Sequence, residues 1–358
     1  MRDVARAAGV SPATVSNVLN QRRNVHPAIA ARVRDAVSSL GYRVDPVAAN
    51  LRRAQSRLVG LVIPDFQNPF FGELVATLER LAEENGFRLT VVSSREDPAV
   101  EAAQVRTLVD WRVAGLIVVP AGATFASRAI IDDAGIRTVI VDRGSGITGF
   151  DSVSVDNEAI AFRATHYLHD EGHRRILLAA SSTNSPNMGQ RIDGALAAAD
   201  ALGIRPGIDV TYCGASVGDT IAALNVRLDQ APLPTAIFAL YNTATLASLR
   251  VVRQHGLSVP DDMSVIGFDD YDWMQVSDPP VTVVSQPIGE MARSAWRRLM
   301  RRMDDDDLKP EQVQIPCSME IRGSVAPPGA ADQTVADIVS GAENARSDRA
   351  RPKNGLKR

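Results

Sequence analysis

Two helices joined by one tight turn are predicted by the run Gly9-Val10-Ser11-Pro12-Ala13-Thr14-Val15-Ser16-Asn17. Gly9 ends the first helix, because glycine adopts at little cost the left-handed backbone conformation that closes a helix. Ser11 caps the next helix and Pro12 occupies its first position, so the second helix starts within three residues of the first. That helix buries Val15 and leaves its opposite face in solvent. Such an arrangement is a helix-turn-helix, whose second helix fits the major groove of DNA.

The charge of the chain is divided unevenly along its length. Residues 1–57 contain ten arginines and three aspartates, a net charge of +7, whereas the whole chain carries −3 and the remainder therefore −10. A basic segment on an acidic body is typical of a nucleic-acid-binding domain attached to a separate domain. The alternative for the first two helices, an ordinary helical hairpin at the edge of a larger domain, leaves this concentration of arginine unexplained. The sequence therefore predicts a DNA-binding domain at the N-terminus.

Composition excludes several other classes of protein. With 358 residues, 45% of them hydrophobic, the chain can bury a sizeable core in one small and one large domain, or in three ordinary ones. Its two cysteines, Cys213 and Cys317, form neither a disulfide framework nor a zinc cluster and suit a reducing cytoplasm. The first residues lack the apolar core of a secretion signal, and no apolar run is long enough to span a bilayer. We therefore expect a cytoplasmic protein without a membrane partner, a cofactor or a metal.

A third helix and a linker follow the helix-turn-helix. The helix is predicted over Pro27–Leu40, with four apolar side chains directed inward: Ile29, Val33, Val37 and Leu40. His26 stands at its cap, where serine or threonine is stronger, at a cost of about 1 kcal/mol at most. The segment Tyr42–Arg53 is too short to form a stable helix alone, but a partner or a DNA groove could support it as one.

From Arg57 onward, predicted strands and helices alternate. The first series has strands Leu58–Pro64, Arg88–Ser94, Gly115–Pro120 and Arg137–Arg143, with helices Phe70–Asn85 and Pro98–Arg112. The second has strands Arg175–Ala180, Asp209–Cys213, Thr235–Leu240 and Ser264–Asp270, with helices Asn157–Glu171, Gly189–Leu202, Val217–Gln230 and Asn242–His255. Such α/β series form parallel sheets covered by helices on both faces, and two of them indicate two lobes with a cleft between them. Residues 329–358 have little apolar content and no sustained heptads, so we expect a disordered tail.

The sequence resembles the LacI/GalR family of bacterial repressors along nearly its whole length. The likeness rests on short motifs in a fixed order: Asp3-Val4-Ala5, Gly9-Val10-Ser11, Ala13-Thr14-Val15-Ser16, Val18-Leu19-Asn20, Leu40-Gly41-Tyr42 and Pro46-Val47-Ala48. The resemblance implies a head at 1–43, a hinge helix and linker at 44–56, and a body at 57–328 with the fold of periplasmic sugar-binding proteins. In that body, Gln286 to Met303 crosses back to the first lobe. The resemblance also implies a homodimeric transcriptional repressor that binds double-stranded operator DNA and is controlled by a small-molecule effector, expected to be a sugar or related metabolite.

The predicted DNA contacts lie on the second helix, just after it, and in the hinge. Four positions of the second helix are expected to face base edges: Pro12, Ala13, Ser16 and Asn17. Four polar or basic residues are expected to hold phosphates: Thr14, Asn20, Arg22 and Arg23. The amide of Asn17 can pair with adenine through two hydrogen bonds, and the family often has arginine there, so the operator should differ at that base. The resemblance adds Leu51, at the position of a leucine that the family wedges between bases of the minor groove.

A ligand site is predicted where the strands of the two lobes end, because ligands of open parallel sheets bind beyond the carboxyl ends of the strands. That rule selects a mostly polar set: Asp65, Asn68, Phe70, Phe71, Ser93, Ser94, Pro120, Ala121, Asp142, Arg143, Ser181–Asn184, Tyr241, Asn242 and Asp269. Polar groups with aromatic rings suit a polyol or sugar. The resemblance adds Arg191 and supports an effector-binding role for Phe70, Phe71 and Asp269, and for Asn242, where the family more often has aspartate. For Arg143 and Asn242 the alternative is capping of a strand end.

Three motifs are typical of an enzyme or a metal site, but the sequence around each of them argues against such a site. Gly144–Gly149 has the spacing of a dinucleotide fingerprint, but a strand-like run follows where that fingerprint requires a helix. Gly214–Gly218 spells the nucleophile elbow of hydrolases in a suitable strand–turn–helix context, yet only His255 follows it as a possible base. The histidines at 166–173 lack a clear third metal ligand. We expect no enzyme; the remaining rival is a solute-binding protein with the same body, which requires a signal peptide and no basic head.

Overall fold

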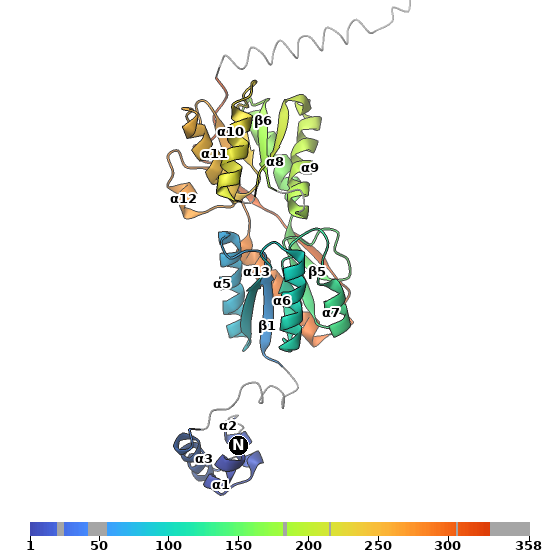
Figure 1. Cartoon of the computed structure of the whole chain (residues 1–358), viewed down its shortest axis with the longest axis vertical. Helices are drawn as coiled ribbons and strands as arrows, with labels where there is room; N and C mark the ends of the chain where they lie inside the picture. Colours follow the sequence, from blue (N-terminus) through green and yellow to red (C-terminus); the bar gives the residue numbers. More distant parts are fainter. Residues whose placement is uncertain (20–24, 42–55, 182–184, 215, 306, 330–358) are drawn as a thin grey trace, which may run out of the picture. The chain divides into compact units, whose positions relative to one another are not determined.

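In the computed structural model, the described residues are 1–19, 25–41, 56–181, 185–214, 216–305 and 307–329 (Figure 1). The chain divides into two compact units, Met1–Arg57, which contains the predicted head, and Leu58–Arg358, which contains the predicted body. The predicted hinge and tail lie outside the described residues, apart from Ser56 and Gly329. Among the described residues, no helix combines the length and the hydropathy needed to cross a membrane.

The head contains three helices, α1 (Arg2–Ala8), α2 (Pro12–Leu19) and α3 (Pro27–Ser39). Gly9 closes α1 in the left-handed conformation at φ 61°, as predicted. The Ser11 hydroxyl accepts a hydrogen bond of 3.1 Å from the N–H of Thr14, which caps α2. The core of the head consists of six buried side chains: Val4, Ala5, Ala8, Val15, Val33 and Ala36. Local signals thus predicted the turn and the core of the helix-turn-helix.

Two details of α3 bear on the predictions. His26 does cap the helix, with its Nδ1 accepting from the N–H of Ala28 at a long 3.4 Å, in agreement with a weak cap. The prediction of Leu40 as a core residue is wrong, because its side chain is 50% exposed. Leu40 is the cap residue after the last helical turn rather than a member of that turn.

The body consists of two lobes, each built on a six-stranded sheet, with the orders β11-β5-β4-β3-β1-β2 in lobe 1 and β12-β10-β9-β8-β6-β7 in lobe 2. The strands of lobe 1 are β1 (Leu58–Ile63), β2 (Arg88–Ser93), β3 (Gly115–Val118), β4 (Thr138–Val141), β5 (Asp151–Val155) and β11 (Gln312–Ile315). The strands of lobe 2 are β6 (Ile176–Ala180), β7 (Ile208–Tyr212), β8 (Ala236–Ala239), β9 (Ser264–Phe268), β10 (Thr282–Ser285) and β12 (Ser318–Glu320). All neighbouring strands are parallel except β10 and β12. Because the two orders match, β4 of lobe 1 occupies the place that β9 occupies in lobe 2.

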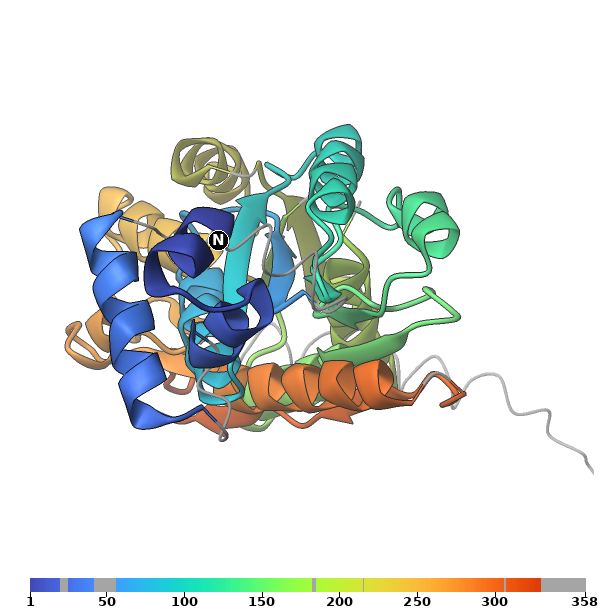
Figure 2. The same ribbon diagram turned by 90° about the horizontal axis from the view of Figure 1, so that it is seen from below.

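Helices cover both faces of each sheet. In lobe 1, α5 (Pro69–Glu84) and α13 (Ile288–Asp304) pack on one face, and α6 (Pro98–Asp110) and α7 (Arg128–Ala134) on the other; Figure 2 shows α13 in orange, opposite α6 and α7 in teal and green. In lobe 2, α8 (Asn157–Asp170) and α9 (Pro186–Ala201) cover one face, and α10 (Val217–Leu228) and α11 (Asn242–Gln254) the other. Two short helices, η1 (Arg205–Gly207) and α12 (Asp272–Gln275), complete lobe 2. Strand side chains alternate between the two faces: Leu61 and Ile63 join the core under α5, whereas Val62 joins the core under α6.

The chain passes between the lobes three times, before α8, before α13 and between β11 and β12. The predicted return of Gln286 to Met303 to the first lobe is confirmed by α13, which packs on α5 and on the strands of lobe 1. Five elements were not predicted: α7, η1, α12, β10 and β12. They span seven, three, four, four and three residues, too few for a clear periodic pattern. The strand-like run after Gly149 is β5, so Gly144–Gly149 lacks the helix of a dinucleotide site.

Candidate functional site

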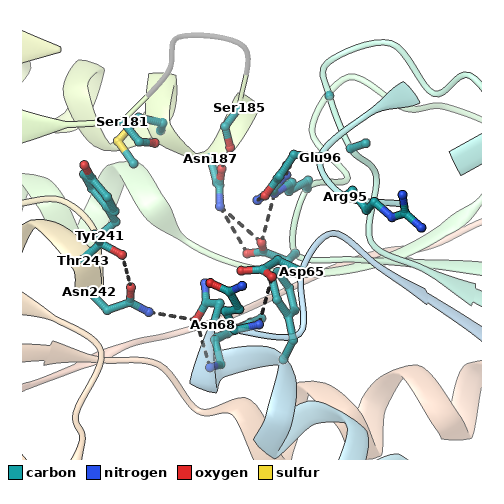
Figure 3. Close-up of a pocket in the computed structure, with 18 of the residues that line it drawn as sticks. Asp65, Asn68, Arg95, Glu96, Ser181, Ser185, Asn187, Tyr241, Asn242 and Thr243 are labelled. Carbon is teal, nitrogen blue, oxygen red and sulfur yellow. Dashed lines mark hydrogen bonds and ion pairs between the residues drawn. The ribbon is translucent and has the colours of Figure 1, made fainter. Parts of the chain in front are cut away.

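A cavity of about 1470 Å³ lies between the two lobes at the carboxyl ends of their strands. Figure 3 shows polar side chains from both lobes directed into it, with Asp65, Asn68 and Glu96 from lobe 1 and Asn187 and Asn242 from lobe 2. This is the edge that the rule for parallel sheets selects. The prediction of a cleft between two lobes at this edge is therefore confirmed.

Backbone strain is concentrated at this cavity. Among the described residues, five that are not glycine have a positive φ, and four of them line the cavity: Arg95, Glu96, Asp142 and Asp269. A non-glycine residue held in this conformation costs free energy of about 1–3 kcal/mol, and such residues cluster at ligand-binding sites. Their position identifies the cavity as the functional site of the body.

Asp269 lies at the centre of a hydrogen-bond network in lobe 2. Its buried carboxylate accepts bonds from the Gln286 amide at 2.6 Å, the Asn242 amide at 3.1 Å and the Tyr271 hydroxyl at 3.2 Å. Burial raises the pKa of Asp269 above its ordinary value, while the Gln286 bond, the charge of Arg191 and the remaining bonds act in the opposite direction. The carboxylate is therefore held in one orientation before any ligand arrives.

Arg191 of α9 lines the cavity and is 4% exposed. Its Nε donates to the Asn157 side chain at 2.8 Å, and its Nη1 donates to the Leu240 carbonyl at 2.7 Å. The guanidinium also stacks on the Phe268 ring, 3.6 Å from the ring centre. Burial lowers the pKa of Arg191, although the charges of Asp142 and Asp269 oppose this effect. The side chain is thus fixed between two carboxylates, one from each lobe.

Arg143 and Asp142 end the corresponding strand of lobe 1. Glu96 binds Arg143 through both of its carboxylate oxygens, at 2.5 and 2.8 Å. Burial acts to lower the pKa of Arg143, but the bond and charge of Glu96 outweigh it and the pKa is raised. Arg143 also donates to the Pro120 carbonyl at 3.3 Å, so the terminal nitrogens of this residue already have partners within its own lobe.

Among the described residues, three pairs of side chains form hydrogen bonds with each other across the cleft. The Asn242 amide donates to Asn68 at 2.8 Å, as Figure 3 shows. The Asn187 amide donates to both oxygens of Asp142, at 3.2 and 3.4 Å. At the rim, Gln190 donates to the Ser145 hydroxyl at 3.1 Å. These bonds depend on the lobe angle, because each pairs a residue of lobe 1 with one of lobe 2.

The aromatic residues of the cleft differ from the prediction in their placement. Phe70 and Phe71 lie in the first turn of α5, within the predicted helix, but they are only 3% and 2% exposed. Their rings meet edge to face, 5.2 Å apart, and pack in the core beneath the cleft. Phe66, which was not predicted, lines the cleft in the preceding loop with 63% of its surface exposed. The apolar environment under α5, which is a tertiary feature, buries the phenylalanine pair.

Six of the other residues predicted for the cleft line the cavity. Asp65, Asn68, Ser93, Ala121, Ser181 and Tyr241 line the cavity, whereas Ser94 is buried beneath it and residues 182–184 lie outside the described residues. Sequence reasoning missed Glu96, Asn187, Asn157 and Gln286, which bind the predicted residues from distant parts of the chain. A weak signal existed for Asn187, because it follows Ser185-Pro186 at the start of a helix beyond a strand.

The serine and the histidine that could have formed a hydrolase site have structural roles. Ser216 caps α10, and its hydroxyl donates to Asp219 at 2.6 Å. His255 contacts Val251 and Asp229 and is not a partner of that serine. Within the described residues, no group of three His, Cys, Asp or Glu side chains is arranged to hold a metal.

In the head, the predicted base-reading positions all lie on α2. Pro12 and Ala13 are exposed, and Ser16 and Asn17 are half-buried. The Thr14 hydroxyl lies 2.9 Å from that of Ser11. Three residues expected to contact phosphates, Asn20, Arg22 and Arg23, and the hinge residue Leu51 lie outside the described residues.

Comparison with known proteins assigns both units. Residues 1–45 match the profile of bacterial regulatory proteins of the lacI family, and residues 165–325 match that of the periplasmic binding protein-like domain. The ribose operon repressor of Escherichia coli (strain K12) is 31% identical over 328 residues, which cover 90% of this chain and 99% of that protein. The chain belongs to the LacI family.

Solved structures of two transcriptional regulators share the fold over 90% of this chain. A lac repressor dimer bound to operator and the anti-inducer ONPF is 25% identical with a TM-score of 0.81, and the match covers 90% of this chain and 98% of that one. A complex of the transcriptional regulator CelR with cellobiose is 28% identical with a TM-score of 0.69 over the same shares. This LacI-family chain is therefore a DNA-binding transcriptional regulator with an effector-binding body, and neither the solute-binding nor the hydrolase alternative applies.

Proposed function

We propose that the chain is a homodimeric repressor whose operator affinity is controlled by a neutral sugar or related polyol bound between the lobes. In this proposal the head spans 1–43, the hinge 44–56, the body 57–328 and a dispensable tail 329–358. The observation that carries the ligand assignment is the group formed by buried Arg191 and Asp269 and half-buried Asn242, which we name the inner cluster. Its carboxylate, amide and guanidinium groups are the partners that hydroxyl groups require.

The charges around the cavity favour a ligand without net charge. In the part of the lining that the structure describes there are four carboxylates, from Asp65, Glu96, Asp142 and Asp269, and three guanidinium groups, from Arg95, Arg143 and Arg191. Neither sign dominates, so a strongly anionic or cationic ligand would lack complementary charge. Six residues are proposed to line the bound effector: Phe70, Phe71, Arg143, Arg191, Asn242 and Asp269. The cellobiose in the CelR complex is a neutral sugar of this kind.

The proposed DNA contacts form two groups, residues that recognise bases and residues that bind phosphates. Pro12, Ala13, Ser16 and Asn17 would face base edges, and Thr14, Asn20, Arg22 and Arg23 would hold phosphates. Leu51 of the hinge would wedge into a minor-groove step, which unstacks bases at a cost of a few kcal/mol and bends the duplex. The lac repressor dimer bound to operator supports the pairing of two chains on one site.

The coupling between the two sites follows from the cross-lobe bonds. A ligand in the cleft competes with, or adds to, the bonds of Asn68, Asn187 and Ser145 to the opposite lobe. It therefore stabilises one lobe angle over another, and a difference in affinity for two conformations is what couples an effector to DNA binding.

A thermal-shift screen of sugars, polyols and nucleosides tests the effector assignment, because a specific ligand raises the melting temperature by mass action. Hits are then measured by calorimetry in Arg191→Ala and Asp269→Ala, where the loss of bonds worth roughly 1.5–3 kcal/mol each should abolish the response. Operator affinity without ligand should stay near that of the parent. Unchanged ligand affinity in both variants would rule out this site.

The DNA assignment is tested on cognate and scrambled duplexes. Asn17→Ala should cost about 1–3 kcal/mol on the cognate site and relax preference at one base pair. Arg22→Ala should weaken binding to both duplexes and reduce the salt dependence by about one unit of slope. Equal losses of Asn17→Ala on both duplexes would contradict base reading by this residue.

Light scattering tests the assembly state. The full chain and a chain that ends at Pro328 should both be dimers, since the tail lacks sustained heptads. A stable tetramer that becomes a dimer on truncation would contradict a dispensable tail.

A further inference from the structure

Phe66 is unusual among the exposed apolar residues of the body. Of the nine large hydrophobic side chains that are exposed in the described part of the chain, it alone lines the cleft. The other aromatic residues of the described lining, Phe70, Phe71 and Tyr241, are buried or half-buried. Single exposed apolar residues are ordinary on a protein surface, but one at a polar ligand cleft offers a flat face to whatever enters.

The loop that carries Phe66 has a defined shape. The Asp65 carboxylate accepts a hydrogen bond of 2.9 Å from the N–H of Gln67, which fixes a tight turn around Phe66. Asn68 then caps α5 through the N–H of Phe70 at 3.0 Å. With both sides of the loop anchored, the Phe66 ring is presented from a fixed backbone.

The distance from Phe66 to the inner cluster is short. Asn68 accepts a hydrogen bond of 2.8 Å from Asn242, a member of that cluster. Phe66 stands two residues before Asn68, so their Cα atoms are at most about 7 Å apart. Phe66 therefore lines the cleft from a loop that is itself in contact with the inner cluster through Asn68.

The size of the cavity agrees with a second ring. Its volume of about 1470 Å³ exceeds the range of about 300–1,000 Å³ that is usual for small-molecule pockets. One sugar ring at the inner cluster would leave the Phe66 side of the cleft unfilled.

We propose that the effector is a two-ring glycoside, with one polyhydroxylated ring at the inner cluster and a second, glycosidically linked ring stacked on Phe66. This inference rests on the proposed function and adds an outer subsite to it. The second ring is either another sugar or a nucleoside base, since both present a face that stacks on an aromatic ring.

Calorimetry on the full chain tests the subsite with ligand pairs that differ by one ring: glucose and cellobiose, and ribose and adenosine. In the parent, the two-ring ligand of one pair should bind at least ten-fold more tightly than the one-ring ligand of that pair. If that pair is glucose and cellobiose, the second ring is a sugar; if it is ribose and adenosine, the second ring is a base. Phe66→Ala should remove most of that gain, about ten-fold in Kd, and leave the one-ring ligand unaffected. Phe66→Trp should retain the gain.

Trp111→Ala is the matched control, because it removes an aromatic side chain that is 57% exposed and does not line the cleft. It should bind both members of a pair as the parent does, and circular dichroism checks that each variant is folded. Equal affinities for one-ring and two-ring ligands in the parent, or an undiminished gain in Phe66→Ala, would overturn the outer subsite alone. If neither member of either pair binds, the sugar assignment itself fails, and the outer subsite with it.

Discussion

Asp142 and Asp269 occupy the same place in the two lobes of the body. Asp142 follows β4 and Asp269 follows β9, the strands at matching positions of the two sheets. Both have a left-handed backbone, with φ of 66° and 65°, and both are buried beside Arg191. Each precedes a charged residue that is paired within its own lobe, Arg143 with Glu96 and Asp270 with Arg322.

The two carboxylates differ in where their hydrogen bonds come from. Asp269 is bound by three side chains of its own lobe, Gln286, Asn242 and Tyr271. Asp142 accepts its side-chain bonds across the cleft, from Asn187 of lobe 2, at the longer distances of 3.2 and 3.4 Å. The same backbone position therefore supplies a fixed anchor in one lobe and a bond between lobes in the other.

This difference indicates that the two carboxylates have different functions. An anchor that keeps its partners when the lobes move is suited to hold a ligand in one orientation. A carboxylate bonded across the cleft changes its environment with the lobe angle, so it is suited to report whether the cleft is closed. Four predictions test this contrast.

The largest effect is expected from Asp269→Ala. The substitution removes the acceptor of three half-buried donors and a buried charge that faces Arg191, so the free energy of unfolding should fall by about 3 kcal/mol or more. Urea denaturation measures this loss, and the effector response should disappear. Asp269→Asn, which keeps an acceptor, should lose less. A decrease below about 1 kcal/mol for Asp269→Ala would contradict the role of Asp269 as an anchor.

Asp142→Ala should lower the free energy of unfolding less than Asp269→Ala does, but it should change the angle between the lobes more. Its lost bonds to Asn187 are long, so we expect a decrease of about 1–2 kcal/mol in the free energy of unfolding. Without ligand, small-angle X-ray scattering should show a more open body than in the parent. Asn187→Ala keeps the charge of Asp142 and removes the same bonds, so it should open the body to a similar extent. If Asp142→Ala destabilises the body as strongly as Asp269→Ala, the contrast fails.

The pH dependence of stability should identify Asp269. Burial raises its pKa above the ordinary value of 3.8, so the folded chain binds this proton more tightly than the unfolded chain. The contribution of Asp269 to stability is therefore greatest below pH 3.8 and declines as the pH rises through the folded-state pKa. Denaturation at a series of pH values should show this decline in the parent relative to Asp269→Asn. A difference that stays constant with pH would exclude the raised pKa.

The smallest effect is expected at the rim. Ser145 is exposed and accepts one hydrogen bond of 3.1 Å from Gln190 of the opposite lobe. Ser145→Ala should change the free energy of unfolding by less than about 0.5 kcal/mol, because water replaces the lost bond. Scattering should show an unchanged lobe angle. If Ser145→Ala opened the body as much as Asn187→Ala does, the lobe angle would depend on the bond between Gln190 and Ser145 and not on Asp142.

Local signals account for what could be predicted from the sequence. The turn of the head depends on Gly9, Ser11 and Pro12, which interact with residues a few positions away. The alternation of strands and helices in the body follows from hydrophobic runs and their boundaries, so most elements were predicted to within a few residues. Asp269 was selected because it lies at the end of a predicted strand, and Arg191 because of the resemblance to the LacI family.

Tertiary structure alone decided which side chains meet in the cleft. Glu96 binds Arg143 from 47 positions away, and Asn242 binds Asn68 from 174 positions away. Burial followed the same rule, since the core beneath α5 covers Phe70 and Phe71 and leaves Phe66 exposed. Hydrogen-bond capacity and hydrophobicity belong to each residue and can be read from the chain. Partners far apart in sequence are selected only when the packed sheets and the lobe crossings bring them within a few ångströms.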